Sequence, residues 1–442
     1  MSGPIEGRAP RRGRAGVPAG RLGAAVVGLG GAVATTAVAG VELLRLGVCG
    51  RDGLPLAART DLVPYEDLVF GGWDVSADDL AKAAHLHRVL EPAQIEAVAP
   101  QLQRLRPWPA VADSDYCRAV TGANVVAVDG LRERTERIRE DLRGFRDRQG
   151  LDEVVVVNLA STERLPDPAS PALASAEAFE AALDAGDEAV TPSMLYAYAA
   201  LREGMAYVNF TPSAGAGVPA LTLLAERAGV PVAGKDGKTG QTMVKTVLAP
   251  ALRSRALRVE GWYSTNLLGN RDGQALEDPD SLASKTATKE SVLDAVLGYP
   301  VEDHKVRIEY YRPRGDEKEA WDNVDLVGFL GRRMQMKIDF LCRDSVLAAP
   351  LVLELVRLLA EARRRGERGV QEQFGYFFKA PMTADGNVPE HALHRQERIL
   401  LDWLDGQDGQ DGQDGQDRQD RQDGLDGLHE PARGYAVRSA RS

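Results

Sequence analysis

Cysteine is scarce in this chain of 442 residues, and the three that occur are Cys49, Cys117 and Cys342. They are widely spaced and odd in number, so they form no disulfide framework and no metal-binding spacing. This usage indicates a reducing, cytoplasmic setting. His85 and His87 share no helical face and have no acidic ligand motif beside them, so no zinc site is expected.

An excess of positive charge is also lacking, because the formal net charge is -11. That balance argues against sequence-independent binding to nucleic acid or to an anionic membrane. A leucine-rich membrane run is lacking as well. Residues 22–48 follow a basic segment and could pass for an export signal, but they are rich in glycine and alanine and carry Glu42 and Arg45. They are better interpreted as a strand that turns at Gly28–Gly31 into a helix, which leaves residues 1–21 as a predicted disordered basic tail.

Helical and strand patterns alternate along most of the chain. Residues 76–90 and 131–149 are expected to be helices, and the β-branched run at 152–160 is typical of a strand covered on both faces. Three helix-then-strand repeats follow between residues 193 and 264. Such alternation predicts an α/β fold with a parallel, doubly wound sheet, whose ligands lie at the carboxyl ends of strands. The polar residues expected there are Asn158, Ser161, Thr211, Ser213 and Asp236.

The first turn, GLGGAVATT, is similar to a dinucleotide-binding fingerprint in which Val33 or Ala34 would replace the third glycine. Glycines at this point let the backbone approach a pyrophosphate at the helix N-terminus. Any tight strand-to-helix turn also favours glycine, so the motif alone leaves both readings open. The acidic residue that would bind the ribose is either Asp52, which has the expected spacing, or Asp74, which directly follows the apolar LVFGGW.

The stretch from Gly234 to Lys289 concentrates lysine and side-chain amides after a strand-loop-helix unit. This composition predicts a site for a phosphorylated, hydroxyl-rich ligand, and the alternative is a solvated polar loop. Beyond it, residues 305–313 and 327–344 are expected to be antiparallel strands, and 345–365 a long apolar helix that packs back on the first domain. From residue 405 the chain becomes Gly-Gln-Asp triplets, a predicted low-complexity disordered tail.

Ten motifs occur in a fixed order, and together they resemble the myo-inositol-1-phosphate (inositol-3-phosphate) synthase family from about residue 22 to residue 404. They are GLGGxxxTT, GGWDVS, NLASTERL, SMLYAYAALREGMAYVNFTPS, GKDGKTGQT, NLLGNRDG, SKTATK, GDEK, CRDSVLAAPLVLEL and FFKAPMT. The resemblance implies an enzyme that converts glucose 6-phosphate into an inositol monophosphate with NAD that is reduced and reoxidised within one turnover. It also implies a homotetramer and a place at the first step of inositol and phosphatidylinositol biosynthesis.

The fold implied by the resemblance is a Rossmann-like doubly wound parallel sheet with an inserted α+β domain for catalysis and oligomerisation. The expected divisions are a tail (1–21), an NAD-binding domain (22–241), the inserted domain (242–343), a return to the NAD-binding domain (344–404) and a second tail (405–442).

The resemblance assigns site residues position by position. Catalysis is expected from Lys285, Lys289, Lys318, Lys379, Asp344 and Asp236. Substrate binding is expected from Thr239, Gly240, Gln241, Asn266, Asn270 and Asp272. NAD binding is expected from Gly28, Gly30, Gly31, Ala32, Asp74, Ala160, Thr211 and Asp236. No metal ligand is assigned, and assistance by a divalent metal or a monovalent cation stays open.

Three positions depart from the family pattern: Arg271, Ala32 and Lys235. Arg271 and Lys235 leave open a cyclitol-pathway paralogue that acts on a related sugar phosphate. A plain NAD-dependent dehydrogenase is the other alternative, since it would share the glycine turn.

Overall fold

The computed structural model describes residues 20–118, 121–269, 273, 293–384 and 387–406. The chain divides after Gln396 into two compact units. Both sheets and the site described below lie in the first unit. Of the second unit, the structure describes the end of helix α12 (Leu393–Leu404) and two following residues. Among the described helices, none combines the length and the apolar character needed to cross a membrane.

The first sheet has seven strands in the order β11-β6-β5-β4-β1-β2-β3. Their pairings are parallel throughout, as the alternating sequence pattern predicts. The strand β1 (Leu22–Val27) lies between β2 (Val69–Asp74) and β4 (Glu153–Asn158), so the chain leaves β1 on one side and later returns on the other. Such a reversal opens a crevice at the carboxyl ends of the strands. The remaining strands are β3 (Trp108–Pro109), β5 (Ala206–Asn209), β6 (Pro231–Gly234) and β11 (Gly369–Val370).

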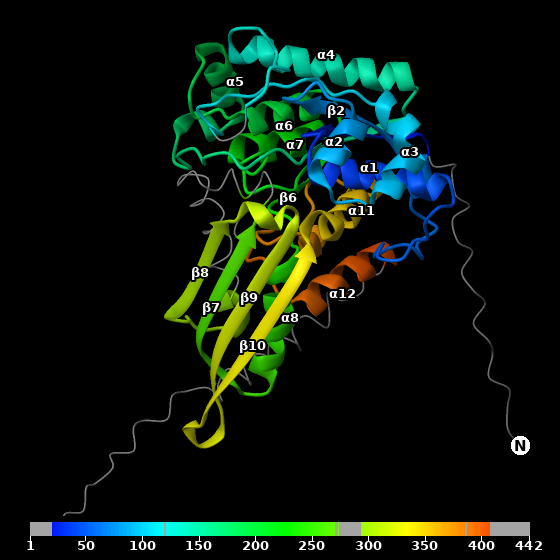
Figure 1. Cartoon of the computed structure of the whole chain (residues 1–442). Helices are drawn as coiled ribbons and strands as arrows, with labels where there is room; N and C mark the ends of the chain where they lie inside the picture. The colour runs from blue at the N-terminus through cyan, green and yellow to red at the C-terminus, as the bar shows by residue number, and fades with distance from the viewer. Residues whose placement is uncertain (1–19, 119–120, 270–272, 274–292, 385–386, 407–442) are drawn as a thin grey trace, which may run out of the picture. The chain divides into compact units, whose positions relative to one another are not determined.

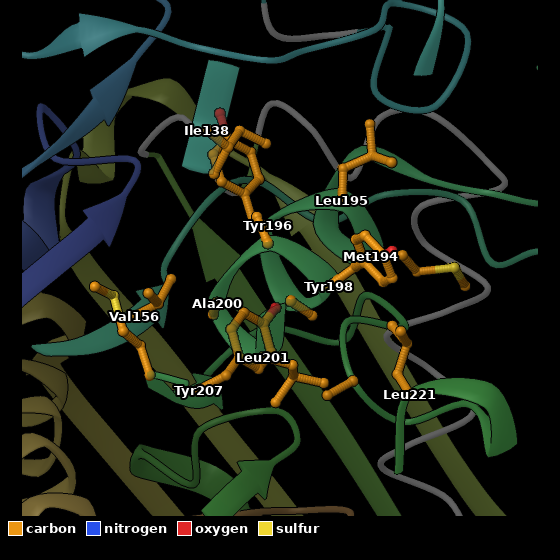
Figure 2. Packing of buried hydrophobic residues seen from close by; sticks show 14 of the residues in the cluster. Ile138, Val156, Met194, Leu195, Tyr196, Tyr198, Ala200, Leu201, Tyr207 and Leu221 are labelled. Atoms are coloured by element: carbon orange, nitrogen blue, oxygen red, sulfur yellow. The ribbon is translucent and has the colours of Figure 1, made fainter. Parts of the chain in front are cut away.

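Helices link and cover these strands. Helix α6 (Pro192–Arg202) is buried over almost its whole length because it packs against α4 (Leu131–Gln149), α7 (Pro219–Ala228), β4 and β5. Figure 2 shows side chains of this helix, among them Met194, Tyr196 and Leu201, beside those of neighbouring elements such as Ile138, Val156 and Leu221. The other helices of this region are α1 (Ala32–Arg45), α2 (Leu80–His87), α3 (Pro92–Arg104) and α5 (Ala176–Ala185).

Helix α11 (Asp344–Arg364) brings the C-terminal part of the chain back to the first sheet. It contacts α1, β4, β5 and β6, as its long apolar pattern predicts. Its first residue therefore stands at the boundary between the first sheet's layer and the second sheet.

The second sheet has four strands in the order β10-β9-β7-β8, with α8 (Gly240–Ser254) packed against it (Figure 1). The strands are β7 (Arg258–Leu268), β8 (Asp303–Tyr310), β9 (Glu317–Val327) and β10 (Arg333–Arg343). The expectation of antiparallel strands at 305–313 and 327–344 was wrong for the first of them, because β8 pairs with β7 and runs parallel to it. Strand β10 is antiparallel as expected, and its partner is β9, a strand that the sequence pattern did not indicate.

The sequence pattern did not indicate β9 because of the residues on the inward face of this strand. That face carries Lys318 and Asp322 beside Ala320, Val324 and Leu326, and all five are buried. Charged residues on an inward face break the apolar alternation by which a half-buried strand is recognised. The expected strand at 327–344 also starts later, at Arg333, because residues 328–332 form the hairpin turn.

Candidate active site

A cavity of about 270 Å³ opens at the carboxyl edge of the first sheet. Its walls come from the β1–α1 turn, the ends of β2, β4 and β5, the loop after β6, the start of β9, the start of α11 and residue Lys379. Of the residues expected at the site, the cavity is lined by Gly28, Gly30, Gly31, Ala32, Asp74, Ala160, Thr211, Asp236, Thr239, Lys318, Asp344 and Lys379.

The β1–α1 turn has the geometry of an anion-binding loop. Gly28 has a φ of 88°, and its N–H donates to the carbonyl of Trp73 at 2.8 Å. Helix α1 begins directly after Gly31, with no acidic side chain in its first turn. The free N–H groups of a helix start favour a negatively charged group.

Asp74 holds this turn and faces the cavity. Its Oδ2 accepts from the N–H of Gly30 at 2.9 Å, and its Oδ1 accepts from the N–H of Ser76 at 2.9 Å. Of the two acidic candidates, Asp74 lines the cavity, whereas Asp52 lies in an exposed turn and is not part of the lining. A carboxylate at the end of β2 suits the hydroxyl groups of a nucleotide ribose. The glycine turn, the helix start and Asp74 together fit a dinucleotide.

His87 is a cavity-lining residue that the sequence did not single out as functional. Its Nε2 lies 2.8 Å from the carbonyl oxygen of Gly30, so Asp74 contacts the N–H of Gly30 and His87 contacts its carbonyl. The only sequence signal was its position at the end of the helix that follows Asp74.

The loop after β6 supplies the first of two lysine–carboxylate pairs. Asp236 has a φ of 60°, in the left-handed region, and its carboxylate contacts Lys379. The Nζ of Lys379 donates to Oδ1 of Asp236 at 2.7 Å, and the two side chains are 6% and 4% exposed. A charge pair this buried is stable only because each ion compensates the other.

The second pair joins the start of β9 to the start of α11. The Nζ of Lys318 lies 3.4 Å from Oδ2 of Asp344, and the hydroxyl of Thr239 donates to Oδ1 of Asp344 at 2.8 Å. Asp316, which the sequence reasoning did not select, fixes this junction. Its carboxylate accepts from the hydroxyl of Ser345 at 2.7 Å and from the Ser345 N–H at 3.2 Å, next to Asp344.

Three of the expected substrate-binding residues lie elsewhere. Gly240, Gln241 and Asn266 are described but do not line the cavity. The Nε2 of Gln241 donates to the buried carboxylate of Asp322 at 3.2 Å, and its Oε1 accepts from Asn266 at 2.6 Å. Within the described part of the chain, the Asn266 Oδ1 has no hydrogen-bond partner. This network joins α8 to the second sheet.

Four of the expected residues lie outside the part of the chain that the structure describes. They are Lys285, Lys289, Asn270 and Asp272.

A buried polar network supports the cavity wall at the ends of β4 and β5. The hydroxyl of Ser193 donates to Glu163 at 2.6 Å, and both residues line the cavity. Burial raises the pKa of the Glu163 carboxyl above its ordinary value, against the lowering effect of its Ser193 hydrogen bonds. Neither residue was selected from the sequence, although both fall within motifs that carry the family resemblance.

The fold and the cavity define a dinucleotide-binding α/β protein whose cofactor crevice opens onto two lysine–carboxylate pairs, one buried and one partly buried. Comparison with known proteins agrees with this class. An NAD-binding family model described as myo-inositol-1-phosphate synthase matches residues 51–405. The chain belongs to this family.

Individual relatives carry the same description. Inositol-3-phosphate synthase 1 of Bacteroides thetaiotaomicron is 41% identical in an alignment of 404 positions that covers 86% of this chain and 94% of that protein. Inositol-3-phosphate synthase 1 of Rattus norvegicus is 36% identical in an alignment of 368 positions that covers 78% of this chain and 65% of the rat protein. Among solved structures, inositol-3-phosphate synthase from Caenorhabditis elegans superposes with a TM-score of 0.80 at 27% identity, covering 87% of this chain and 85% of that one.

Proposed function

We propose that the chain is an inositol-3-phosphate synthase, which isomerises D-glucose 6-phosphate to 1D-myo-inositol 3-phosphate with NAD as a catalytic cofactor. One observation carries the proposal. The buried pair Lys379–Asp236 and the partly buried pair Lys318–Asp344 line the same cavity as the glycine turn. A substrate held between them would face both a dinucleotide and two ammonium groups.

The cofactor would be held by Gly28, Gly30, Gly31, Ala32, Asp74, Ala160, Thr211 and Asp236. When bound, NAD supplies a hydride acceptor and then a hydride donor. The glycine turn would orient the pyrophosphate, and Asp74 would hold a ribose. The walls formed by Ala160 and Thr211 would exclude water from the reacting end.

The lysines would stabilise the negative charge that develops on substrate oxygens during oxidation, enolisation, aldol cyclisation and reduction. Fixed ammonium groups in a closed site do so without reorganising. Lys318 would polarise the carbonyl at C5, with Asp344 holding its ammonium in place. Lys379 would support the oxyanion at C1. Lys285 would relay the proton of the C5 hydroxyl and Lys289 would bind the phosphate or the C5 oxygen, roles that rest on the family resemblance.

Further properties of the whole protein are inferred from the family resemblance and, for its location, from the scarcity of cysteine. We infer division into an NAD-binding part (22–241 and 344–404) and an inserted part (242–343), assembly as a homotetramer, a cytoplasmic location and a role in inositol and phospholipid biosynthesis. A divalent metal or monovalent cation as an additional cofactor is left unassigned.

The test is incubation with glucose 6-phosphate and NAD at one-hundredth of the substrate concentration. A synthase is expected to convert all of the substrate to an inositol phosphate, identified by chromatography of the phosphate esters, with no net rise in absorbance at 340 nm. A dehydrogenase would stop after one equivalent of NAD and release NADH. If a different sugar phosphate is cyclised and glucose 6-phosphate is not, the paralogue reading replaces this one.

A further inference from the structure

Lys379 lies on a short segment, Phe377–Met382, that docks on the loop after β6. The N–H of Lys379 donates to the carbonyl of Asp236 at 2.7 Å, and the N–H of Met382 donates to Gly234 at 2.6 Å. On the loop side, the N–H of Lys235 donates to Ala380 at 3.0 Å. These backbone bonds hold the docked segment 377–382 in place and set the position of the Lys379 ammonium.

Lys238 binds the first residue of this docked segment and a second residue far beyond its end. Its backbone N–H donates to the carbonyl of Phe377 at 2.8 Å, two residues before Lys379. Its side-chain Nζ donates to Oε1 of Gln396, well beyond the segment. The Nε2 of Gln396 in turn donates to the carbonyl of Glu390 at 2.5 Å, just before α12 begins.

Lys238 is buried and does not belong to the cavity wall. It is 4% exposed, and its Nζ lies 5.9 Å from the ring centroid of Tyr376. The titratable groups around it are Tyr376, Glu390 and His391. Burial lowers the pKa of Lys238 to about 7, with Glu390 acting in the opposite direction. Burying an amine costs free energy that an apolar side chain of similar size would not cost. The feature that distinguishes Lys238 from such a side chain is its hydrogen bond to Gln396.

We propose that Lys238 is a positioning residue for Lys379, which acts through its bond to Gln396 by holding the docked segment against the Asp236 loop. The consequence for turnover rests on the proposed function. Misplacing a catalytic group by about 1 Å can cost ~10²-fold in rate. Loss of the bond between Lys238 and Gln396 should therefore slow the chemical step. The β1–α1 glycine turn, which forms no part of this bond network, should keep its structure.

The experiment compares Lys238→Met, Gln396→Leu, the double variant and the exchanged pair Lys238→Gln with Gln396→Lys. Lys82→Met, an exposed lysine on α2, is the control for removal of a lysine. Three quantities are measured on the full chain: kcat with glucose 6-phosphate, the Kd of NAD, and hydrogen exchange of the amides in residues 377–382.

Each single variant is expected to lower kcat by about tenfold or more, with the Kd of NAD within about twofold of wild type, and to speed amide exchange in the docked segment. The double variant should be no worse than Gln396→Leu, because that single variant already lacks the bond that Lys238→Met removes, in addition to the Gln396 bond to Glu390. The exchanged pair should recover slow exchange and part of kcat.

The proposal would be overturned if Lys238→Met kept the wild-type kcat and the wild-type rate of amide exchange. It would also be overturned if the losses of kcat in the two single variants added up in the double variant. If Lys238→Met fails to fold, Gln396→Leu and the exchanged pair decide by the same criteria. If the wild-type enzyme makes no inositol phosphate, the proposed function fails, while the exchange measurements still decide whether Lys238 holds the segment.

Discussion

Two lysine–carboxylate pairs dominate the site at the scale of single residues. In the buried pair of Lys379 and Asp236, each charge makes the burial of the other tolerable. The pair is therefore both a structural contact and a proposed catalytic device, and the two roles are separable by mutation.

Lys379→Met is expected to lower kcat by roughly 10²–10³-fold, as removal of a transition-state donor does. It should also destabilise the fold by about 3–5 kcal/mol, because it leaves Asp236 buried without its cation. Adding Asp236→Asn should restore stability and not activity. Steady-state kinetics and urea unfolding measure the two effects, and a double variant that regains kcat would contradict the catalytic role.

The lowered pKa of Lys238 predicts a pH-dependent stability. Burial lowers this pKa from 10.5 to about 7, so between these values the unfolded chain binds a proton that the folded protein does not. The free energy of unfolding should thus rise with pH across this window, and Lys238 should contribute up to ~1.4 kcal/mol per pH unit to that rise. Below pH 7 the residue is protonated in both states, so it should contribute no change with pH. Lys238→Met should lack this contribution. Equal pH slopes for the two proteins in chemical denaturation would refute the expectation.

At the scale of elements, the β1–α1 turn depends on a glycine at position 28. Its φ of 88° is unfavourable for other residues, and a Cβ there would lie 3.0 Å from the carbonyl oxygen of Leu159. Gly47 has a φ of 64° with nothing within 4 Å of a Cβ, so it is a matched control.

Gly28→Ala is expected to abolish measurable NAD binding. The added Cβ would press against the carbonyl oxygen of Leu159, so the turn would have to shift away from the position in which it binds the cofactor. Gly47→Ala should cost only the backbone strain, about 1–2 kcal/mol, with an unchanged Kd. Calorimetric titration with NAD distinguishes them, and equal Kd values would show that the turn tolerates a side chain.

Helix α11 carries Asp344 at its start and is pinned further along by a buried cluster. Glu354 accepts from the N–H of Leu56 at 2.9 Å and from the hydroxyl of Tyr65 at 2.5 Å, and Arg357 donates to it at 2.6 Å. These bonds fix the α1–β2 connection on α11.

Glu354→Ala should destabilise the fold by about 3–5 kcal/mol, since it leaves the Arg357 cation buried without a counter-charge. Arg368→Ala, which removes an exposed ion pair with Glu226, should cost less than about 1 kcal/mol. Urea midpoints test the contrast, and similar losses in both variants would argue against the pinning role.

At the scale of the whole molecule, the cofactor should act as a stabilising ligand. NAD at one hundred times its Kd is expected to raise the free energy of unfolding by about 2.7 kcal/mol. NADP at the same concentration should do much less, because its extra phosphate would meet the Asp74 carboxylate. Thermal or urea unfolding with each nucleotide is the measurement, and equal stabilisation would remove Asp74 from the ribose site.

The sequence by itself determined the local elements and the class of fold. The helix expected at 131–149 spans those same residues, and the valine run at 152–160 forms β4 (Glu153–Asn158). Such features depend on hydrophobic periodicity, which each segment carries in itself. The family resemblance likewise rested on motifs that can be read one after another along the chain.

Only the tertiary structure decided which distant residues meet. Lys379 and Asp236 are 143 positions apart, and nothing in either segment indicates the other. The strand β9 was hidden because its inward charges, Lys318 and Asp322, have partners that come from other elements. Burial of a charge is favourable only once its counter-group arrives, so these positions are set by the packing of the whole fold and not by any local pattern.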